Sequence, residues 1–358
     1  MRRDVIDVHH AVSRREFLRA AGLAGAGAVL LGACGSDGSK GGPTSTPEAV
    51  VDPPPETTTI RLAKSTNNPR TAPIFLAEQF LAAEGFTTVQ YIEVPIRNDG
   101  VEELAAGEID MGIPFAPALT VAADRGDPIV VLAGVQSATT EVFGSDRVQS
   151  LRDLKGKRIW GGRDEANGAY AFWAALLAYV GIDIEREVEF VDVSATDLFA
   201  QAQEGKLDAW TLTRPISTLY RNANVGHIIL DTMVDAPWSQ HLASMATGNR
   251  DFVEQHPAAT KRALRAILQA ADVCASEPER AARYLVDRGY TVWDYDLTLD
   301  GIRAPSYTAW REFNPEDTVR FYALRLNEAG LVESTPDELI ARATDWRYLD
   351  EIKQELAV

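Results

Sequence analysis

The chain has few cysteines and few histidines for its length, and both shortages restrict its chemistry. Its 358 residues include two cysteines, Cys34 and Cys274, and five histidines. Two cysteines cannot build the disulfide framework of a small secreted domain, and the apolar helical pattern around Cys274 predicts a buried side chain. The histidines lack ligand spacing, and no nucleophile or phosphate-loop motif stands out. We therefore expect no metal, no cofactor and no catalysis.

Positive charge is also scarce. Lysine and arginine total 35 residues against 52 aspartates and glutamates, which gives a formal net charge of -17 at pH 7. Nucleic acids and anionic membrane surfaces are bound by basic faces, so the composition argues against both as partners of the folded body. The length is sufficient for two ordinary domains, each with its own core.

No hydrophobic run is long enough to span a bilayer. The uncharged run from Ala20 to Ala33 is too short and too rich in glycine and alanine, which is typical of an export signal. Arg14-Arg15, followed by Phe17-Leu18, resembles a twin-arginine signal. The pattern predicts a signal peptide over residues 1–33, and the choice between the twin-arginine and the general export route stays open.

A lipid anchor is predicted directly after this signal. Leu31-Gly32-Ala33-Cys34 resembles the lipobox of bacterial lipoproteins, in which the cysteine becomes the lipidated first residue. Residues 35–57 consist largely of glycine, serine, threonine and proline and cannot bury enough apolar surface to fold. We expect Cys34 to be lipidated and residues 34–57 to form a disordered tether, which places the protein outside the cytoplasm, on the periplasmic or extracellular face of the cell membrane.

Two stretches of the body look like copies of one unit. Residues 107–117 and 205–215 each begin with a glycine that ends a helix, continue with Ile-Asp or Leu-Asp opening a strand, and end in a proline that starts the next helix. A chance recurrence of so short a pattern is the alternative. Strands and helices alternate along the whole body, which predicts mainly parallel sheets. The repeat predicts two similar lobes that face one cleft.

Four motifs of the body together resemble one superfamily. They are Gly107-Glu108-Ile109-Asp110, Ser150-Leu151-Arg152-Asp153-Leu154-Lys155-Gly156-Lys157, Gly205-Lys206-Leu207-Asp208-Ala209 and Asn249-Arg250-Asp251-Phe252-Val253 followed by His256-Pro257. In this combination the body resembles the nitrate, sulfonate and taurine binding proteins of ABC importers, whose superfamily includes pyrimidine-precursor binders and thiamine pyrimidine synthases.

The resemblance implies an α/β fold of the two-lobed periplasmic-binding-protein type (type II, or flytrap), with additional C-terminal helices. We expect residues 58–145 with 238–358 to form lobe 1 and residues 146–237 to form lobe 2. By position in the motifs, the resemblance implies ligand contacts from Ser65, Thr66, Asn67, Arg70, Phe115, Ala116, Gly162, Arg163, Asn167, Thr213, Arg214 and Trp238.

Several of these residues have a second interpretation. Arg214 could hold an acidic ligand or form a surface ion pair. Phe115 and Trp238 could stack on a flat ring, whereas Trp160 and Trp210 lie within strands and fit core packing better. Many relatives resemble one another in having small hydroxyl residues near the helix start of lobe 2. Here Asp164 and Glu165 are adjacent to it and would already satisfy the helix dipole, which argues against an anion there.

The resemblance implies a monomeric solute-binding lipoprotein that delivers a small molecule to the permease and ATPase subunits of an ABC importer. The polar and aromatic residues of the expected cleft favour an organic ligand with a polar or acidic group and an apolar or aromatic part. Two alternatives remain open. One is an enzyme similar to the thiamine pyrimidine synthases, although their cysteine-rich motif does not occur in this chain. The other is a ligand sensor without a transporter.

Overall fold

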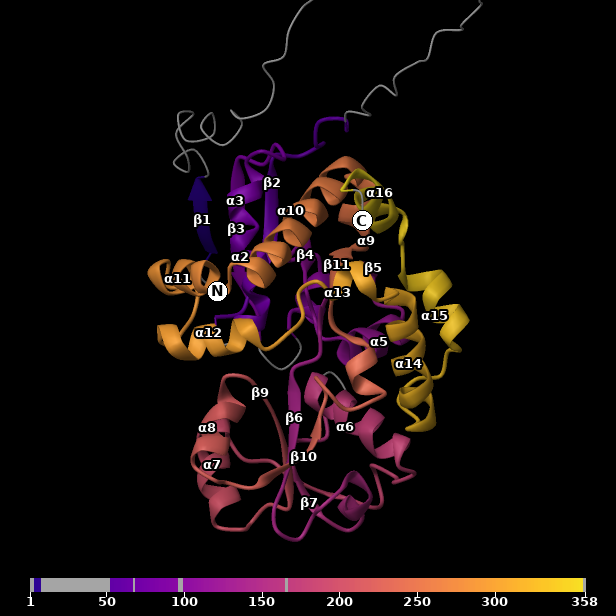
Figure 1. Ribbon diagram of the computed structural model, residues 1–358. Helices are drawn as coiled ribbons and strands as arrows, with labels where there is room; N and C mark the ends of the chain where they lie inside the picture. The colour runs from indigo at the N-terminus through magenta and orange to yellow at the C-terminus, as the bar shows by residue number, and fades with distance from the viewer. Residues whose placement is uncertain (1–2, 8–51, 67, 96–98, 165–166, 357–358) are drawn as a thin grey trace, which may run out of the picture.

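The chain forms two lobes, each built on one β-sheet with helices packed around it (Figure 1). The structure is a computed structural model, and it describes residues 3–7, 52–66, 68–95, 99–164 and 167–356. In the view of Figure 1, lobe 1 lies above and lobe 2 below. The two-lobed α/β architecture predicted from the sequence is confirmed.

Lobe 1 contains a six-stranded sheet. Its strands, in spatial order, are β1 (Arg3–Asp7), β3 (Thr88–Glu93), β2 (Thr59–Lys64), β4 (Met111–Gly112), β11 (Leu242–Asn249) and β5 (Ile129–Ser137). Strand β2 pairs in parallel with β3 and β4, whereas β11 is antiparallel to β4 and β5. Strand β1 pairs with the edge strand β3 and belongs to the segment predicted to be a signal peptide. If that segment is removed, β3 becomes the edge of the sheet.

Helices cover lobe 1 on both sides, and most of them come from the C-terminal third of the chain (Figure 1). They are η2 (Pro69–Thr71), α2 (Ala72–Leu76), α3 (Glu78–Leu81), α4 (Val101–Ala105), α5 (Ala116–Arg125), α9 (Arg250–Gln255), α10 (Pro257–Ser276), α11 (Pro278–Asp287), α12 (Tyr295–Arg303), α13 (Ala309–Glu312), α14 (Pro315–Glu328), α15 (Pro336–Ala343) and α16 (Arg347–Glu355). The long helix α10 begins at a proline in its first turn and buries an apolar stripe that includes Leu264, Ile267 and Leu268.

Lobe 2 contains a five-stranded sheet. Its strands, in spatial order, are β10 (His227–Asp231), β6 (Thr140–Gly144), β9 (Ala209–Thr213), β7 (Arg158–Trp160) and β8 (Glu189–Val191). Its helices are η3 (Leu151–Leu154), α6 (Gly168–Tyr179), α7 (Ala195–Gln203) and α8 (Ile216–Asn222), and η4 (Trp238–Gln240) lies on the return to lobe 1. Strand β7 is parallel to β8 and β9, but β6 is antiparallel to β9 and β10.

Both sheets are therefore mixed, whereas the sequence pattern predicted mainly parallel sheets. The difference comes from the crossings between lobes, because β6 and β11 enter their sheets antiparallel to their neighbours. Strand β6 also moves the first lobe boundary. It belongs to the sheet of lobe 2, so the chain crosses at Ala138–Thr139 and not after residue 145. The mostly polar residues 136–141 mark this crossing in the sequence, and the predicted boundary after residue 145 was placed too late.

The internal repeat predicted from the sequence has a matching hydrogen-bond arrangement in each lobe. In lobe 1, the Asp110 carboxylate accepts from the backbone N–H of Arg61 at 2.7 Å, and the Arg61 guanidinium donates to Asp110 and to the Gly107 carbonyl. In lobe 2, Asp208 accepts from the backbone N–H of Arg158 at 2.9 Å, and Arg158 donates to the Gly205 carbonyl. Each aspartate thus joins its strand to the preceding parallel strand in the same way.

The lobes also share apolar packing on one side. Helix α6 of lobe 2 packs against α5 and α14 of lobe 1, and a continuous hydrophobic cluster runs through all three. The Phe172 ring of α6 lies 5.6 Å from Phe115, measured between ring centroids. This contact lies beside the strands that cross between the lobes.

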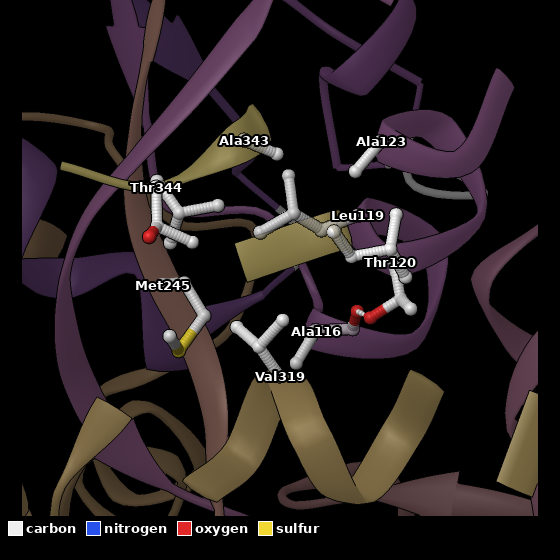
Figure 2. Close-up of a pocket in the computed structure, with 10 residues that line it drawn as sticks. Ala116, Leu119, Thr120, Ala123, Met245, Val319, Ala343 and Thr344 are labelled. Atoms are coloured by element: carbon white, nitrogen blue, oxygen red, sulfur yellow. Dashed lines mark hydrogen bonds between the residues drawn. The ribbon is translucent and has the colours of Figure 1, made fainter. Parts of the chain in front are cut away.

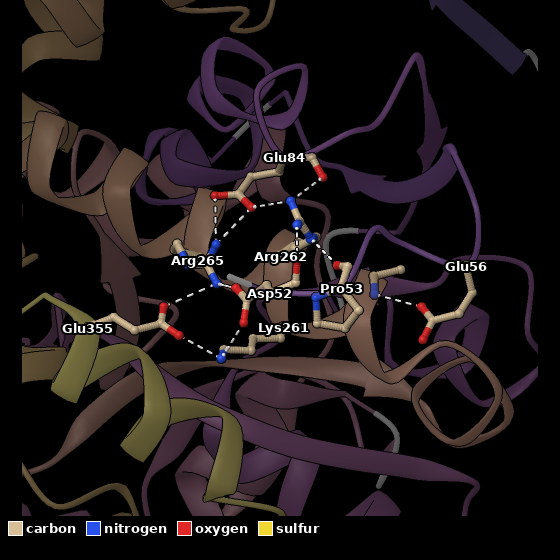
Figure 3. A network of polar contacts seen from close by, with 9 residues as sticks. Asp52, Pro53, Glu56, Glu84, Lys261, Arg262, Arg265 and Glu355 are labelled. Carbon is tan, nitrogen blue, oxygen red and sulfur yellow. Dashed lines mark hydrogen bonds and ion pairs between the residues drawn. The ribbon is translucent and has the colours of Figure 1, made fainter. Parts of the chain in front are cut away.

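A network of charges holds residues 52–57 against lobe 1 (Figure 3). Asp52 pairs with Lys261 at 2.8 Å and with Arg265, and the Glu56 carboxylate accepts from two backbone N–H groups of the first turn of α10. Burial alone would raise the pKa of Asp52, but the hydrogen bonds from Lys261 and Arg265 lower it overall. The predicted tether of residues 34–57 therefore includes at its end six residues that belong structurally to lobe 1.

Candidate functional site

The junction between the lobes is where the carboxyl end of β5, the start of β6 and the beginning of β11 lie together. Gln136 of β5 pairs in register with Ser244 of β11, and Ser244 also forms a bridge with Phe115. Four residues farther along the chain, Thr140 pairs with Thr213 of lobe 2. Ligands of α/β sheets bind outside the carboxyl ends of strands, so this junction is the candidate site.

Arg70, one of the predicted contacts, lies on the lobe 1 side of the junction and is 7% exposed. It forms a buried ion pair with Asp99, and its guanidinium carbon lies 5.2 Å from the centroid of the Phe115 ring. Asp99 has a positive φ of 50°, which is uncommon for a residue other than glycine. Burial raises the pKa of Asp99, and the opposing effect of Arg70 does not cancel it.

Arg214, also predicted, lies on the lobe 2 side at the end of β9. Its Nε lies 3.4 Å from Oε1 of Glu141, and its Nη1 lies 3.8 Å from Oδ1 of Asp300 in α12 of lobe 1. The Thr218 hydroxyl of α8 donates to Oδ2 of Asp300 at 2.6 Å. Figure 1 shows α12 at the lower edge of lobe 1, facing α8. Asp300 therefore joins the two lobes by polar contacts.

Buried side-chain atoms without a hydrogen-bond partner are concentrated at this junction. Among the described residues, 18 buried side-chain atoms have no partner, and nine of them belong to residues at the junction. These atoms are Oδ1 of Asn68, Nε of Arg70, Oδ1 of Asp99, both polar atoms of Gln136, Oγ1 of Thr139, Oε2 of Glu141, Oγ of Ser217 and Oγ of Ser244. An unpaired buried polar group costs about 1–3 kcal/mol, and a polar molecule at the junction would satisfy these groups.

The predicted contacts at the helix start of lobe 2 have other roles in the structure. Asn167 is the N-cap of α6 and accepts from the backbone N–H of Ala169 at 2.9 Å. Arg163 is exposed, pairs with Glu185 and lies over the Phe190 ring at 5.4 Å. Gly162 lies beside Asp192. The structure does not bring Arg163 together with Arg70, and ligand contacts from all three residues stay predictions.

The remaining predicted contacts fall into two groups. Ala116 is the first residue of α5, and Thr213 ends β9, so both adjoin the junction. The Ser65 carbonyl accepts from the Thr71 hydroxyl at 3.2 Å, and the Thr66 carbonyl accepts from the Val292 N–H at 3.1 Å. Both carbonyls thus fix the loop that leads to Arg70. Asn67 and Cys34 lie outside the described residues.

Trp238 is 1% exposed and packs in the core beside the crossing strands. Its ring lies 5.8 Å from Phe172 and from Tyr179 of α6, and 5.0 Å from Phe321 of α14. Trp238 therefore lies between helices of the two lobes, and a stacking contact with a ligand stays a prediction.

Two hollows lie outside the junction, and both are lined by residues of lobe 1 alone. The cavity in Figure 2 lies between α5, α14 and β11 and is lined mostly by apolar side chains such as Leu119, Met245 and Val319. Its volume of about 10 Å³ accommodates no more than one water molecule. A wider hollow of about 380 Å³ beside Trp346 and Lys353 is formed by lobe 1 alone. Within the described part of the chain, no group of three or more His, Cys, Asp or Glu could hold a metal ion.

Comparison with known proteins decides the family. A family model described as "NMT1/THI5 like" matches residues 68–281. The chain belongs to the NMT1/THI5-like family. The nitrate/nitrite binding protein NrtA of a Nostoc species is 26% identical over 317 residues, which cover 78% of this chain and 71% of that protein. The superfamily recognised from the four sequence motifs is thereby confirmed.

Solved structures of the same fold agree with this assignment. The periplasmic nitrate-binding protein NrtA from Synechocystis superposes with a TM-score of 0.66 at 17% identity, covering 84% of this chain and 90% of that chain. The periplasmic aliphatic sulphonate binding protein SsuA from Escherichia coli gives a TM-score of 0.60 at 16% identity, covering 79% and 92% of the two chains. These likenesses establish the fold of this NMT1/THI5-like chain.

The relatives named here are binding proteins and not enzymes, which supports the expectation of a non-catalytic chain. Cys274 agrees with that expectation, because it is a buried free cysteine in α10 and its burial raises the pKa of the thiol. A thiol held in its neutral form is a poor nucleophile. No helix among the residues that the structure describes is long and apolar enough to cross a membrane.

Sequence reasoning did not identify several residues of this junction, among them Asp99, Gln136, Glu141, Ser217 and Ser244. Asp99 follows a polar loop in the sequence, and the others lie in apolar strands or at a helix start. One available signal was the polar stretch of residues 136–141, which begins with Gln136, ends with Glu141 and interrupts two apolar segments. In the folded chain, Gln136 and Glu141 both lie at the junction between the lobes.

Proposed function

We propose that the protein is an extracytoplasmic solute-binding lipoprotein. It captures a small organic molecule between its lobes and delivers it to the permease and ATPase of an ABC importer. The family assignment, the two-lobed fold and the expected lipobox support this proposal. Genes for an ATPase and a permease beside its own gene would support delivery, and their absence would favour a sensor.

The observation that carries the proposal is the group of unpartnered buried polar atoms at the junction. Asn68 and Gln136 belong to lobe 1, whereas Glu141 and Ser217 belong to lobe 2. A molecule between the lobes would supply hydrogen bonds to both at once, which stabilises the closed arrangement over the open one. Ligand binding and lobe closure are then coupled, so each favours the other.

We expect a bound ligand to make the protein more compact in solution. A calorimetric screen across sulfonates, carboxylates, pyrimidines and flavins should identify a ligand, and small-angle scattering should then be recorded with and without it at saturation. A decrease in the radius of gyration supports capture between the lobes. Identical curves at confirmed saturation would contradict it.

The lipid anchor gives a second prediction. Replacement of Cys34 by alanine should release the protein from the membrane into the soluble fraction, because the thiol that carries the lipid is gone. Cys274→Ala is the matched control, since it removes the other cysteine, and it should leave the protein on the membrane. Detergent phase partitioning of both variants measures this. A Cys34→Ala protein that stays in the detergent phase refutes lipidation at this residue.

A further inference from the structure

The positive charges at the junction are already neutralised by carboxylates. Arg70 pairs with Asp99, and Arg214 and Arg221 both donate toward Oε1 of Glu141, at 3.4 Å and 2.8 Å. Arg221 is further occupied by the Thr218 hydroxyl at 2.8 Å. An oxyanion is held by cations or N–H groups, and each of these arginines already faces a buried carboxylate that an incoming oxyanion would have to displace or lie beside.

Among the unpartnered atoms at the junction, those that can only accept a hydrogen bond outnumber those that can only donate one. Four of the nine can only accept, namely Oδ1 of Asn68, Oδ1 of Asp99, Oε1 of Gln136 and Oε2 of Glu141. Two can only donate, Nε of Arg70 and Nε2 of Gln136. The three hydroxyl groups can do either. Exchanging the two amide atoms of Gln136 leaves this balance unchanged, because both are unpartnered.

Among these residues, Glu141 contributes most to the choice between a hydrogen-bond donor and an oxyanion as ligand. It is fully buried, and both arginines bind the same carboxylate oxygen, Oε1. Oε2 has no partner among the described residues. A buried carboxylate oxygen without a donor is costly, and a ligand N–H would satisfy it, whereas a ligand oxyanion would be repelled.

We propose that the site between the lobes takes an organic molecule with several N–H donors and a positive or zero net charge, and that it excludes bare oxyanions. This inference rests on the proposed function and adds the ligand class to it. The names of the relatives specify nitrate and sulphonate, so the proposal assigns this chain a different specificity within the same fold. A site with unpaired acceptors rejects ligands that cannot donate to them.

Three probes of one shape test the ligand class. Benzamidinium, benzamide and benzoate are planar and nearly equal in size, and they change from a cation with four N–H groups, through a neutral amide, to an anion that only accepts. With the full-length protein, we expect calorimetry to rank their affinities in that order, with benzamidinium at least tenfold tighter than benzoate. Tighter binding of benzoate, nitrate or ethanesulfonate, or no binding of benzamidinium and benzamide, would overturn the proposal.

A charge-neutral variant distinguishes ligand recognition from structural support. Glu141→Gln should weaken the binding of benzamidinium at least tenfold. It should also reduce the preference for benzamidinium over benzoate, because the carboxylate that repels the anion is removed. Glu187→Gln, which breaks an exposed pair with Lys155 on the same lobe, should leave the ranking unchanged. Equal weakening of all three probes by Glu141→Gln would show a purely structural role and refute the proposal. If an oxyanion binds and closes the lobes, the ligand class fails while the proposed function stands.

Discussion

Replacement of Arg70 by alanine is expected to lower the free energy of unfolding by about 3–5 kcal/mol, the range for breaking a buried ion pair from one side. Both partners of the pair with Asp99 are buried, at 7% and 6% exposure, so Asp99 would be left unpaired and without solvent. The contact between the guanidinium and the Phe115 ring would be lost as well. Urea unfolding at constant pH measures the difference.

The loss of unfolding free energy in Arg70→Ala should also depend on pH in a defined direction. The pKa of Asp99 is raised by burial even with Arg70 present, and removing that cation raises it further. A carboxyl group with a raised pKa in the folded state contributes stability below its unfolded pKa and loses it as pH rises through the folded pKa. The deficit of Arg70→Ala should therefore be smaller at pH 5 than at pH 8.

Arg163→Ala is the matched control for this experiment. Arg163 also pairs with a glutamate and lies over an aromatic ring, but it is exposed, and pairs of that kind are worth about 0–1 kcal/mol. Its removal should change the unfolding midpoint little at either pH. Equal losses for the two variants would mean that burial of the pair with Asp99 does not determine its contribution.

The two lobes were predictable because each copy of the internal repeat is a continuous segment of the sequence. Asp110 and Asp208 bind the backbone of Arg61 and Arg158, which lie about fifty residues earlier, and this shared arrangement is what the recurring Gly-x-Ile/Leu-Asp pattern encodes. The mixed order of the sheets was not predictable from alternation alone. Pairing direction depends on how β6 and β11 cross between the lobes, and those contacts are distant in sequence.

The candidate site was only partly predictable. Arg70, Phe115 and Arg214 follow strand ends or begin helices, where sequence motifs point, and the structure places all three around the junction. Gln136 and Glu141 lie inside apolar strands, where a sequence pattern predicts core. Their significance depends on having no partner after folding, and a partner is a tertiary property. The same limitation concerns Asp300, whose contacts with lobe 2 involve residues more than eighty positions earlier.

Removal of the Asp300 carboxylate is expected to weaken ligand binding roughly 5–30-fold, which corresponds to about 1–2 kcal/mol. Its hydrogen bond from Thr218 and its contact with Arg214 connect the lobes, so we expect them to form only when the lobes are closed. Asp300→Ala should therefore shift the equilibrium toward the open form, and a ligand that selects the closed form then has to supply the difference. We expect the ligand-free protein to be mainly open in solution, so its melting temperature should change little.

A double-mutant cycle tests whether the effect is due to this inter-lobe contact. Thr218→Val removes the hydroxyl and keeps the shape, and it should weaken binding of the ligand identified by calorimetry nearly as much as Asp300→Ala. The double variant should then lose less than the sum of the two single losses, because both changes break the hydrogen bond between Thr218 and Asp300. Glu279→Gln, which breaks an exposed pair with Arg303 within lobe 1, should leave the affinity unchanged. Additive losses in the double variant would mean that Asp300 and Thr218 act separately and that their hydrogen bond does not stabilise closure.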